Sequence, residues 1–255
     1  DKLEPNPILV HTIPYMLTLD EIAGTSVVSM AANATVNRSM TNDKAGPILI
    51  KYFMGLATSN EILINIQDSQ YHQYLMNNPI HWNTFIGSGN FPFELPDHFF
   101  VVRSQTLQYE ITDISGLPNT ARLTDDGFRL YFDAEESLFN SLSQANQVSR
   151  LFFYTTDIPV TLAVSPAIQS FYITFLNVAD FMWQRTTLYS DGPFLCRMSN
   201  LSTGYAFSNG WIHSSILGGN AQNYKDFEAM LVRRRSQIKI DFINLSPAPN
   251  RVFLT

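Results

Sequence analysis

The residue types that most often carry chemistry are sparse in this sequence. None of the five histidines stands four residues from an acid on a predicted helix, and none pairs with a cysteine at zinc-ligand spacing. The carboxylates fall mostly in predicted turns, where an aspartate accepts hydrogen bonds from its own backbone. The sequence has no glycine-rich phosphate loop and no Gly-x-Ser-x-Gly motif. We therefore expect a protein that is not an enzyme and that uses no cofactor or metal ion.

Two tryptophans are the best candidates for contact with a ligand. Trp82 directly follows His81, and Trp211 lies two residues before His213 in a segment of similar sequence. An indole ring can fill the core between two sheets, or it can form a flat platform on which a sugar ring stacks. We favour the core interpretation for both side chains and keep sugar stacking as the alternative.

The run Arg233-Arg234-Arg235 is the one dense basic feature of the sequence. It predicts either a solvated or interface-paired strand edge, which we favour, or a site for a polyanion. The net charge of −6 argues against a nucleic-acid-binding protein, because such proteins usually carry a basic excess that neutralises phosphates. We therefore expect no specific nucleic-acid partner.

The elements that would position any site occur twice. Arg103-Ser104-Gln105 opens one alternating stretch, and Arg235-Ser236-Gln237 opens another at an offset of 132 residues (235 − 103). Both stretches close with an Asp/Asn-apolar-Ser turn that leads to Asn119 and Asn250, at an offset of 131 (250 − 119). A constant offset over a long span predicts an internal duplication. Further matches at 132 residues are Asn77 with Asn209, Ile80-His81 with Ile212-His213, and Gly87 with Gly219.

Each half contains seven or eight short alternating stretches separated by turn residues, which is typical of antiparallel sandwiches. Eight strands in two sheets form a jelly roll. We predict an all-β fold of two tandem jelly-roll-like antiparallel β-sandwiches joined by a short helix, in which Asp133 caps the helix. The predicted ranges are an N-terminal arm at 1–7, a first sandwich at 8–132, the linker helix at 133–149 and a second sandwich at 150–255.

Composition adds constraints on the surface. Hydrophobic residues make up 45% of the chain and charged residues 15%, and a surface with few charges is often covered by other subunits. The one cysteine, Cys196, excludes an intrachain disulfide and falls at an inward strand position. No apolar run reaches the length of a membrane helix, and no signal peptide opens the sequence. Because the sequence begins at Asp1 without a methionine, we expect a piece of a longer chain.

The second half contains the motifs Val178-Ala179-Asp180-Phe181, Gly192-Pro193-Phe194, Asn200-Leu201-Ser202-Thr203-Gly204, Ser236-Gln237-Ile238 and Phe242-Ile243-Asn244-Leu245-Ser246. With these motifs it resembles β-rich structural proteins of bacterial viruses. The tandem repeat is similar in layout to double jelly-roll capsid proteins, in which two eight-stranded sandwiches lie side by side. This resemblance implies a virion protein without catalytic residues. The short halves depart from that family, because they leave little room for long tower loops.

We expect a virion structural protein, either a capsid shell subunit or a capsid-associated protein of a bacteriophage. It would assemble in the host cytoplasm with copies of itself or with other virion proteins, through the low-charge sides of its sandwiches, and a homotrimer is favoured. One alternative is a tandem carbohydrate-binding or receptor-binding β-module. Another is a single jelly-roll capsid protein of a small RNA virus, which would show no internal similarity.

Overall fold

The computed structural model contains two compact units built almost entirely from antiparallel strands, which confirms the predicted all-β fold class. The first unit combines the chain up to Leu75 with Ile86–Phe152, and the second combines Met76–Phe85 with Phe153–Thr255. The residues that the structure describes are 9–19, 27–43, 46–70, 72–132, 151–156, 160–164, 167–175, 179–217 and 219–255.

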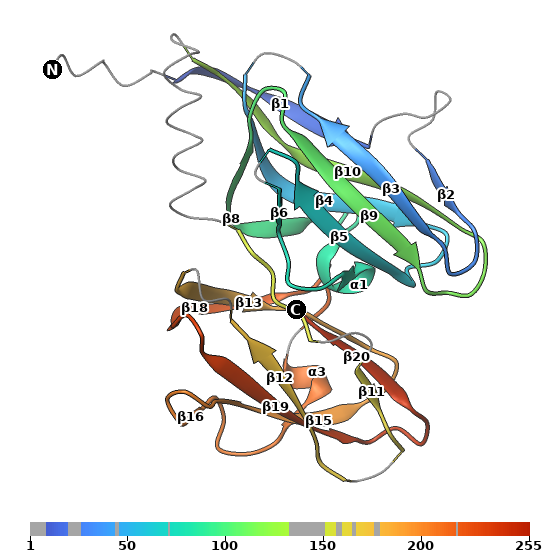
Figure 1. Cartoon of the computed structure of the whole chain (residues 1–255), viewed down its shortest axis with the longest axis vertical. Helices are drawn as coiled ribbons and strands as arrows, with labels where there is room; N and C mark the ends of the chain where they lie inside the picture. The colour runs from blue at the N-terminus through green and yellow to red at the C-terminus, as the bar shows by residue number, and fades with distance from the viewer. Residues whose placement is uncertain are drawn as a thin grey trace, which may run out of the picture. The chain divides into compact units, whose positions relative to one another are not determined.

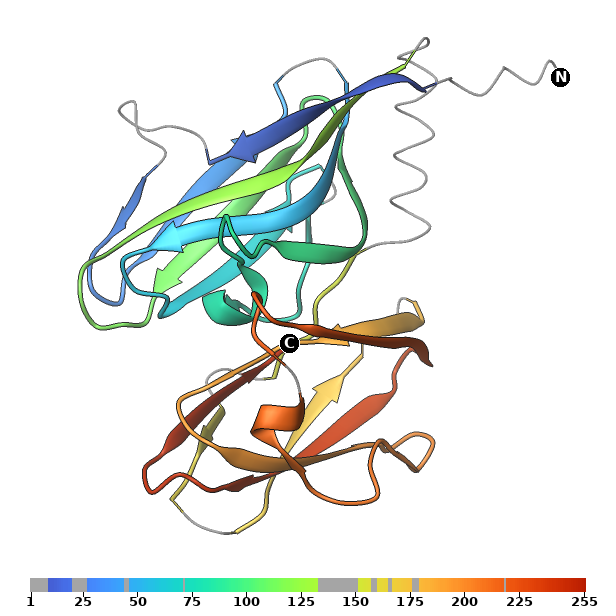
Figure 2. The same ribbon diagram turned by 180° about the vertical axis from the view of Figure 1, so that it is seen from behind.

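The first unit is a sandwich of two sheets (Figure 1). One sheet has the order β3-β9-β5-β6, and the other has the order β1-β10-β4-β8, with β2 also pairing with β10. Figure 2 shows the second of these sheets from behind. The strands are β1 (Leu9–Thr18), β2 (Val28–Met30), β3 (Thr35–Thr41), β4 (Ile48–Ala57), β5 (Ile62–Asp68), β6 (Gln73–Tyr74), β8 (Phe93–Val101), β9 (Thr106–Asp113) and β10 (Asn119–Phe132).

Alternation explains why these segments form strands with one buried face. In β5, the side chains of Ile62, Ile64 and Ile66 are fully buried and alternate with half-buried neighbours. The same period of two appears in β9, where Tyr109 and its apolar neighbours are buried and Glu110 is exposed. One face of the sheet therefore builds the core, and the other face carries polar side chains.

The second unit has the same strand order. Its first sheet is β12-β19-β15-β16, with β17 also pairing with β15, and the remaining strands pair as β11-β20-β14 and β13-β18. The strands β13 and β14 are separated by Thr187 alone and together occupy the place of β4. The elements are β11 (Val160–Leu162), β12 (Gln169–Thr174), β13 (Phe181–Thr186), β14 (Leu188–Ser190), β15 (Phe194–Asn200), β16 (Tyr205–Ala206), β17 (Ile212–His213), α3 (Ser214–Leu217), β18 (Lys225–Val232), β19 (Gln237–Asn244) and β20 (Asn250–Leu254).

Both units therefore have jelly-roll connectivity. If the strands from β2 onward are counted in chain order without the short strand β7 (Ile80–His81), one sheet joins the first, eighth, third and sixth, and the other joins the second, seventh, fourth and fifth. In the first unit these are β2-β10-β4-β8 and β3-β9-β5-β6. The same count holds from β11 in the second unit when β13 and β14 count as one strand and β17 is left out. Strand β1 is an additional strand that lengthens the edge beside β2, because β1 and β2 pair with different segments of β10.

The pairing corrects one part of the predicted repeat. Ser104 and Arg235 both have left-handed backbone conformations, with φ of 64° and 61°, in otherwise equivalent turns. In these turns the N–H of Gln105 donates to the carbonyl of Val102, and the N–H of Ser236 donates to that of Arg233. The predicted match of Arg103 with Arg235 is therefore wrong by one residue, because the equivalent of Arg103 in the second turn is Arg234. The residue is lost before this turn, since Gly87 and Gly219 still form equivalent parallel bridges.

A buried asparagine closes one end of each sandwich. In the first unit, Asn119 accepts a hydrogen bond from the N–H of Ser59 and donates to the carbonyl of Ser59 and to the carboxylate of Asp113, at 3.0, 2.9 and 3.1 Å. In the second unit, Asn250 makes the equivalent pair of bonds with the N–H and the carbonyl of Gly192, at 2.9 and 2.8 Å. Each amide thus joins the loop that leads from one sheet to the other to the first residue of the last strand. That loop lies between β4 and β5 in the first unit and between β14 and β15 in the second. We refer to these two residues and their partners as the asparagine clasps.

The core of the second unit is rich in aromatic rings. Phe194 and Phe242 pack edge to face with ring centroids 5.3 Å apart, and both are fully buried. Cys196 lies in the same core cluster, as expected from its inward strand position. Burial raises the pKa of the Cys196 thiol to about 12, so this thiol is not a reactive nucleophile.

One segment of the first half belongs to the second unit. It contains β7 (Ile80–His81) and α1 (Trp82–Phe85). The side chain of Asn77 exchanges two hydrogen bonds with the backbone of Thr155, at 2.7 and 3.0 Å, and the His81 ring stacks on Tyr189 at 4.4 Å. The predicted ranges 8–132 and 150–255 were contiguous and did not include this assignment of residues 76–85 to the second unit. The predicted arm at 1–7 and the predicted linker helix at 133–149 lie outside the described residues.

A buried hydrogen bond links the two sheets of the first unit. The hydroxyl of Tyr109 on β9 donates to Oδ2 of Asp125 on β10 at 2.5 Å, and both residues are about fully buried, with 1% of their surface exposed. Burial raises the pKa of Asp125 to about 8, although the hydrogen bond from Tyr109 opposes this shift. Burial, followed by the neighbouring Asp125, raises the pKa of Tyr109 well above its ordinary value.

The raised pKa makes the stability of the first unit depend on pH. The folded unit keeps the Asp125 proton up to about pH 8, whereas the unfolded chain releases it near pH 4. Between these values each pH unit should lower the free energy of unfolding by about 1.4 kcal/mol, and below pH 4 the contribution is fully retained. Urea unfolding followed by circular dichroism between pH 5 and pH 8 measures this slope. In Asp125→Asn the slope should disappear.

The neighbouring residue provides the control for this measurement. Asp126 follows Asp125 on β10 but points away from the core and is half-buried. The Asp126→Asn variant should keep the wild-type slope. A slope that survives in Asp125→Asn and is lost in Asp126→Asn would contradict the assignment to the buried carboxyl group.

Candidate functional site

The two predicted tryptophans lie in different surroundings within the second unit. Trp82 is buried, with 3% of its surface exposed. Trp211 is half-buried, and the guanidinium of Arg197 lies over its ring at 5.0 Å from the centroid. The histidines beside them make matching local bonds, because Nδ1 of His81 and Nδ1 of His213 each accept a backbone N–H from two residues further on, at 3.2 Å. The Trp82 ring is thus enclosed by the protein, and a guanidinium lies over one face of the Trp211 ring.

The three predicted arginines lie at the turn that follows β18, and all three are exposed. The guanidinium of Arg233 pairs with Asp180 at 2.8 Å, and the backbone N–H of Arg234 donates to the same carboxylate at 2.9 Å. Arg235 holds the left-handed position of the turn. The structure thus brings Arg233 and Arg234 to one acidic partner but does not gather three guanidinium groups around a common site.

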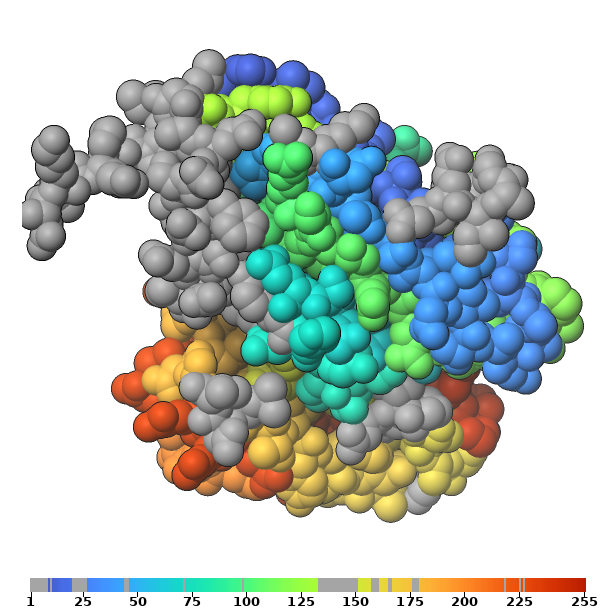
Figure 3. Space-filling model, turned by 45° about the horizontal axis from the view of Figure 1, so that its top comes forward, coloured from blue at the N-terminus to red at the C-terminus, as the bar shows by residue number. Residues whose placement is uncertain are grey.

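Another candidate site lies on the outward face of the sheet β3-β9-β5-β6. Strand pairing sets its side chains in two rows that cross the strands. The first row is Asn37, Glu110 and Asn65, and the second is Ser39, Gln108, Gln67 and Tyr74. Figure 3 shows the side chains of β3, β9 and β5 side by side on this face. We call these seven residues the polar grid.

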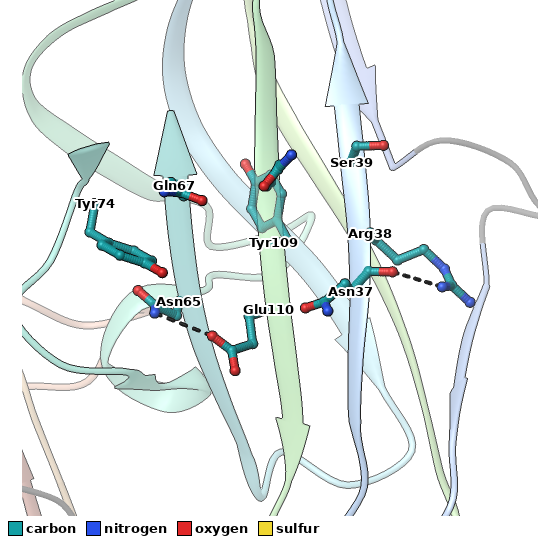
Figure 4. Close-up of a pocket in the computed structure, with 9 residues that line it drawn as sticks. Asn37, Arg38, Ser39, Asn65, Gln67, Tyr74, Tyr109 and Glu110 are labelled. Carbon is teal, nitrogen blue, oxygen red and sulfur yellow. Dashed lines mark hydrogen bonds between the residues drawn. The ribbon is translucent and has the colours of Figure 1, made fainter. Parts of the chain in front are cut away.

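The polar grid borders a shallow hollow of about 460 Å³, with Arg38 at its edge (Figure 4). Nδ2 of Asn65 donates to Glu110 at a long distance of 3.4 Å, and Nη1 of Arg38 donates to the carbonyl of Asn37 at 2.8 Å. The Tyr74 ring is 48% exposed. Within the described part of the chain, Oδ1 of Asn65 is buried without a hydrogen-bond partner. The hollow therefore offers several amide groups, one carboxylate and one accessible aromatic ring.

The equivalent face of the second unit is closed by its own charges. Its first row, Ser170-Asp241-Arg197, matches Asn37-Glu110-Asn65 in the pairing register. Asp241 accepts hydrogen bonds from Ser170 at 2.6 Å and from Arg197 at 3.0 Å, and it pairs with Lys239 at 2.8 Å. Burial raises the pKa of Asp241, but the bonds from Lys239, Ser170 and Arg197 outweigh it and hold this pKa below its usual range.

Sequence reasoning did not single out the polar grid. Its residues occupy the outward positions of ordinary alternating strands, and such positions are polar whether or not they bind anything. The signal that distinguishes them is the pairing of three strands that are distant in sequence, which joins Asn37 to Glu110 and Glu110 to Asn65. That pairing becomes visible only in the folded sheet.

A second surface feature of the first unit is the edge strand β1. In the described part of its sheet, β1 lies at the end of the order and pairs with β10 on one side. Three large apolar side chains on this strand are exposed: Leu9 at 49%, Ile13 at 45% and Met16 at 60%. A long edge strand with exposed apolar side chains is a typical template for contact with another chain.

Comparisons with known proteins do not assign a family. No protein-family model and no curated protein matches this chain. The chain is similar to the crystal structure of PBSX exported protein XepA, with 12% identity, 95% of this chain and 85% of that chain covered, and a TM-score of 0.25. At that score the likeness assigns neither fold nor function.

Among the described residues, no group of three or more histidine, cysteine, aspartate or glutamate side chains could hold a metal ion. No helix of the described chain combines the length and the apolar character that crossing a bilayer requires.

The two matched carboxylates should respond differently to neutralisation. In Asp241→Asn, the cations of Lys239 and Arg197 lose their shared partner, and the free energy of unfolding of the second unit should fall by about 1–2 kcal/mol. In Glu110→Gln, at the matched position of the first unit, the change should stay within about 0.5 kcal/mol.

Urea unfolding with two probes separates these effects. All three tryptophans, Trp82, Trp183 and Trp211, belong to the second unit, so their fluorescence reports its unfolding, whereas circular dichroism reports both units. Equal losses in the two variants would contradict the difference between the closed and the open face.

Proposed function

We propose that this protein is a structural component of a bacteriophage particle that acts by contact with copies of itself or with other virion proteins. Two tandem jelly rolls support this proposal, because jelly rolls are a common plan of viral shell proteins. The motifs that resemble virion structural proteins support it as well. Because lectin domains also have the jelly-roll fold, the fold alone does not decide the function. The proposal therefore depends on a surface that can contact another chain.

The observation that carries the proposal is the edge strand β1. Its free side in the described sheet can accept a strand from another copy, whose side chains would cover Ile13 on one face of the sheet and Met16 on the other. Pro14 interrupts the row of backbone donors at the middle of this strand. An added strand would therefore be held by side-chain burial as much as by the backbone ladder, which favours a defined contact over open-ended aggregation.

We also propose that the two units descend from one duplicated sandwich. The matching strand orders, the equivalent asparagine clasps and the equivalent bridges at Gly87 and Gly219 support this ancestry. A duplicated sandwich would give a shell protein two similar bodies whose surfaces can diverge separately.

Self-association through β1 can be measured directly. Size-exclusion chromatography with light scattering across a dilution series should show concentration-dependent oligomers of the wild-type protein. The double variant Ile13→Lys with Met16→Lys should shift the equilibrium toward the monomer by at least about tenfold in the dissociation constant, because two charges would be buried in the contact.

A matched control tests whether the location matters. Leu117 is 69% exposed in the turn between β9 and β10, away from β1 in the strand order. The Leu117→Lys variant should associate like the wild type. A wild-type protein that stays monomeric at the highest accessible concentration would refute the assembly proposal.

A further inference from the structure

We propose that the polar grid of the first unit binds a short neutral saccharide across the strands β3, β9, β5 and β6. The proposal goes beyond the structural role, because it concerns the other sheet of the unit and does not depend on self-association. It rests on the two rows of side chains, on the hollow they border, and on the contrast with the matched face of the second unit.

The chemistry of the polar grid suits sugar hydroxyls. A sugar hydroxyl both donates and accepts hydrogen bonds, and an amide side chain offers a carbonyl oxygen and an NH₂ group at matching spacing. Asn65, Gln67 and Gln108 are amides on neighbouring strands, and Glu110 adds an acceptor beside Asn65. The Oδ1 of Asn65 is buried without a hydrogen-bond partner among the described residues, so rotation of this amide toward the hollow would let the oxygen accept from a ligand hydroxyl.

Tyr74 supplies the apolar contact that polar groups alone lack. Its ring is 48% exposed and lies at the β6 end of the second row, opposite Gln67 in the register. Figure 4 shows this ring on the same side of the sheet as Asn65 and Glu110. An exposed tyrosine ring can cover the apolar face of a sugar ring while its hydroxyl stays in contact with water.

Charge favours a neutral ligand. Glu110 is the one acid among the seven residues of the polar grid, and Arg38 at the edge donates to the carbonyl of Asn37. A carboxylate near the centre would repel a uronic or sialic acid. The four strands span about 14 Å, which is enough for a short oligosaccharide and too little for a long polymer segment to be fully enclosed.

The second unit shows what the same face looks like when it is not available. There Lys239 occupies the position of Gln108, Arg197 that of Asn65 and Asp241 that of Glu110, and the three charges satisfy one another. The position of Tyr74 is taken by Ala206. One face is thus internally paired, whereas the other leaves its amides directed at the hollow, as expected if only the first unit acquired a ligand.

Saturation-transfer NMR and calorimetry with the full chain test the proposal. The probes are neutral trisaccharides of glucose, galactose, mannose, N-acetylglucosamine and fucose-containing type, together with 3′-sialyllactose as the anionic comparison. At least one neutral probe should bind, and sialyllactose should bind more weakly. Tyr74→Ala and the double variant Asn65→Ala with Gln108→Ala should each weaken binding by at least about tenfold.

The control is Tyr172→Ala on the matched sheet of the second unit, where the tyrosine is 47% exposed. This variant should bind like the wild type, and the fluorescence of the tryptophans, which all belong to the second unit, should not change on binding. Failure of every neutral probe to bind, binding that survives the double variant, or stronger binding of sialyllactose would each overturn the proposal. None of these outcomes would alter the light-scattering result for β1.

Discussion

The buried asparagine clasps constrain everything else in the two sandwiches. Each clasp connects two segments. One is the loop that crosses between the sheets, and the other is the turn that follows β9 in the first unit or β19 in the second. A buried amide that loses its partners costs about 1–3 kcal/mol, so loop and turn must keep one geometry. In the first unit, Asn119 is 2% exposed and Asn250 of the second unit is 0% exposed, so water cannot replace the protein partners. This geometry sets where β10 and β20 begin and therefore helps to set their register.

Register then decides which side chains face outward. A shift of one residue in β9 would turn Glu110 and Gln108 into the core and expose Tyr109, whose hydroxyl bonds to the buried Asp125. The buried pair therefore reinforces the same register from inside the sandwich. The polar grid on the outside and the Tyr109–Asp125 bond on the inside are two consequences of one strand alignment.

The fold class could be predicted because alternation is a local property of the sequence. In β5 the isoleucines occupy every second position, and that pattern alone indicates a half-buried strand. The alignment of the two halves could not be predicted as well. The identical Arg-Ser-Gln sequences that begin at 103 and 235 suggest an alignment that differs by one residue from that of the two turns in the structure. In the structure the residues with left-handed backbone conformation in these turns are Ser104 and Arg235. They differ in residue type, so sequence identity does not align them. The polar grid was missed for a related reason, since it depends on pairing between strands that are distant in sequence. Glu110 on β9 is 73 residues (110 − 37) from its partner Asn37 on β3 and 45 residues from its partner Asn65 on β5.

The two units also show how one sheet plan can hold opposite surface chemistry. The positions of Asn65 and Gln108 in the first unit are held by Arg197 and Lys239 in the second, where a closed ion-pair network forms around one carboxylate. Neither difference touches the buried positions of the strands, so the core alternation and the clasps are preserved. Surfaces of this kind can diverge with little effect on folding.

Assembly and saccharide binding would not compete within the first unit. Strand β1 belongs to the sheet that also contains β10, β4 and β8, whereas the polar grid belongs to the sheet β3-β9-β5-β6. A contact along the edge of the first sheet adds atoms in the plane of that sheet, and the grid faces outward from the other. Because strand addition extends a sheet sideways and leaves the opposite sheet's outer face uncovered, a particle built through β1 would still expose its grids to saccharides. The two proposals thus describe one surface protein that holds neighbours by an edge and a ligand by a face.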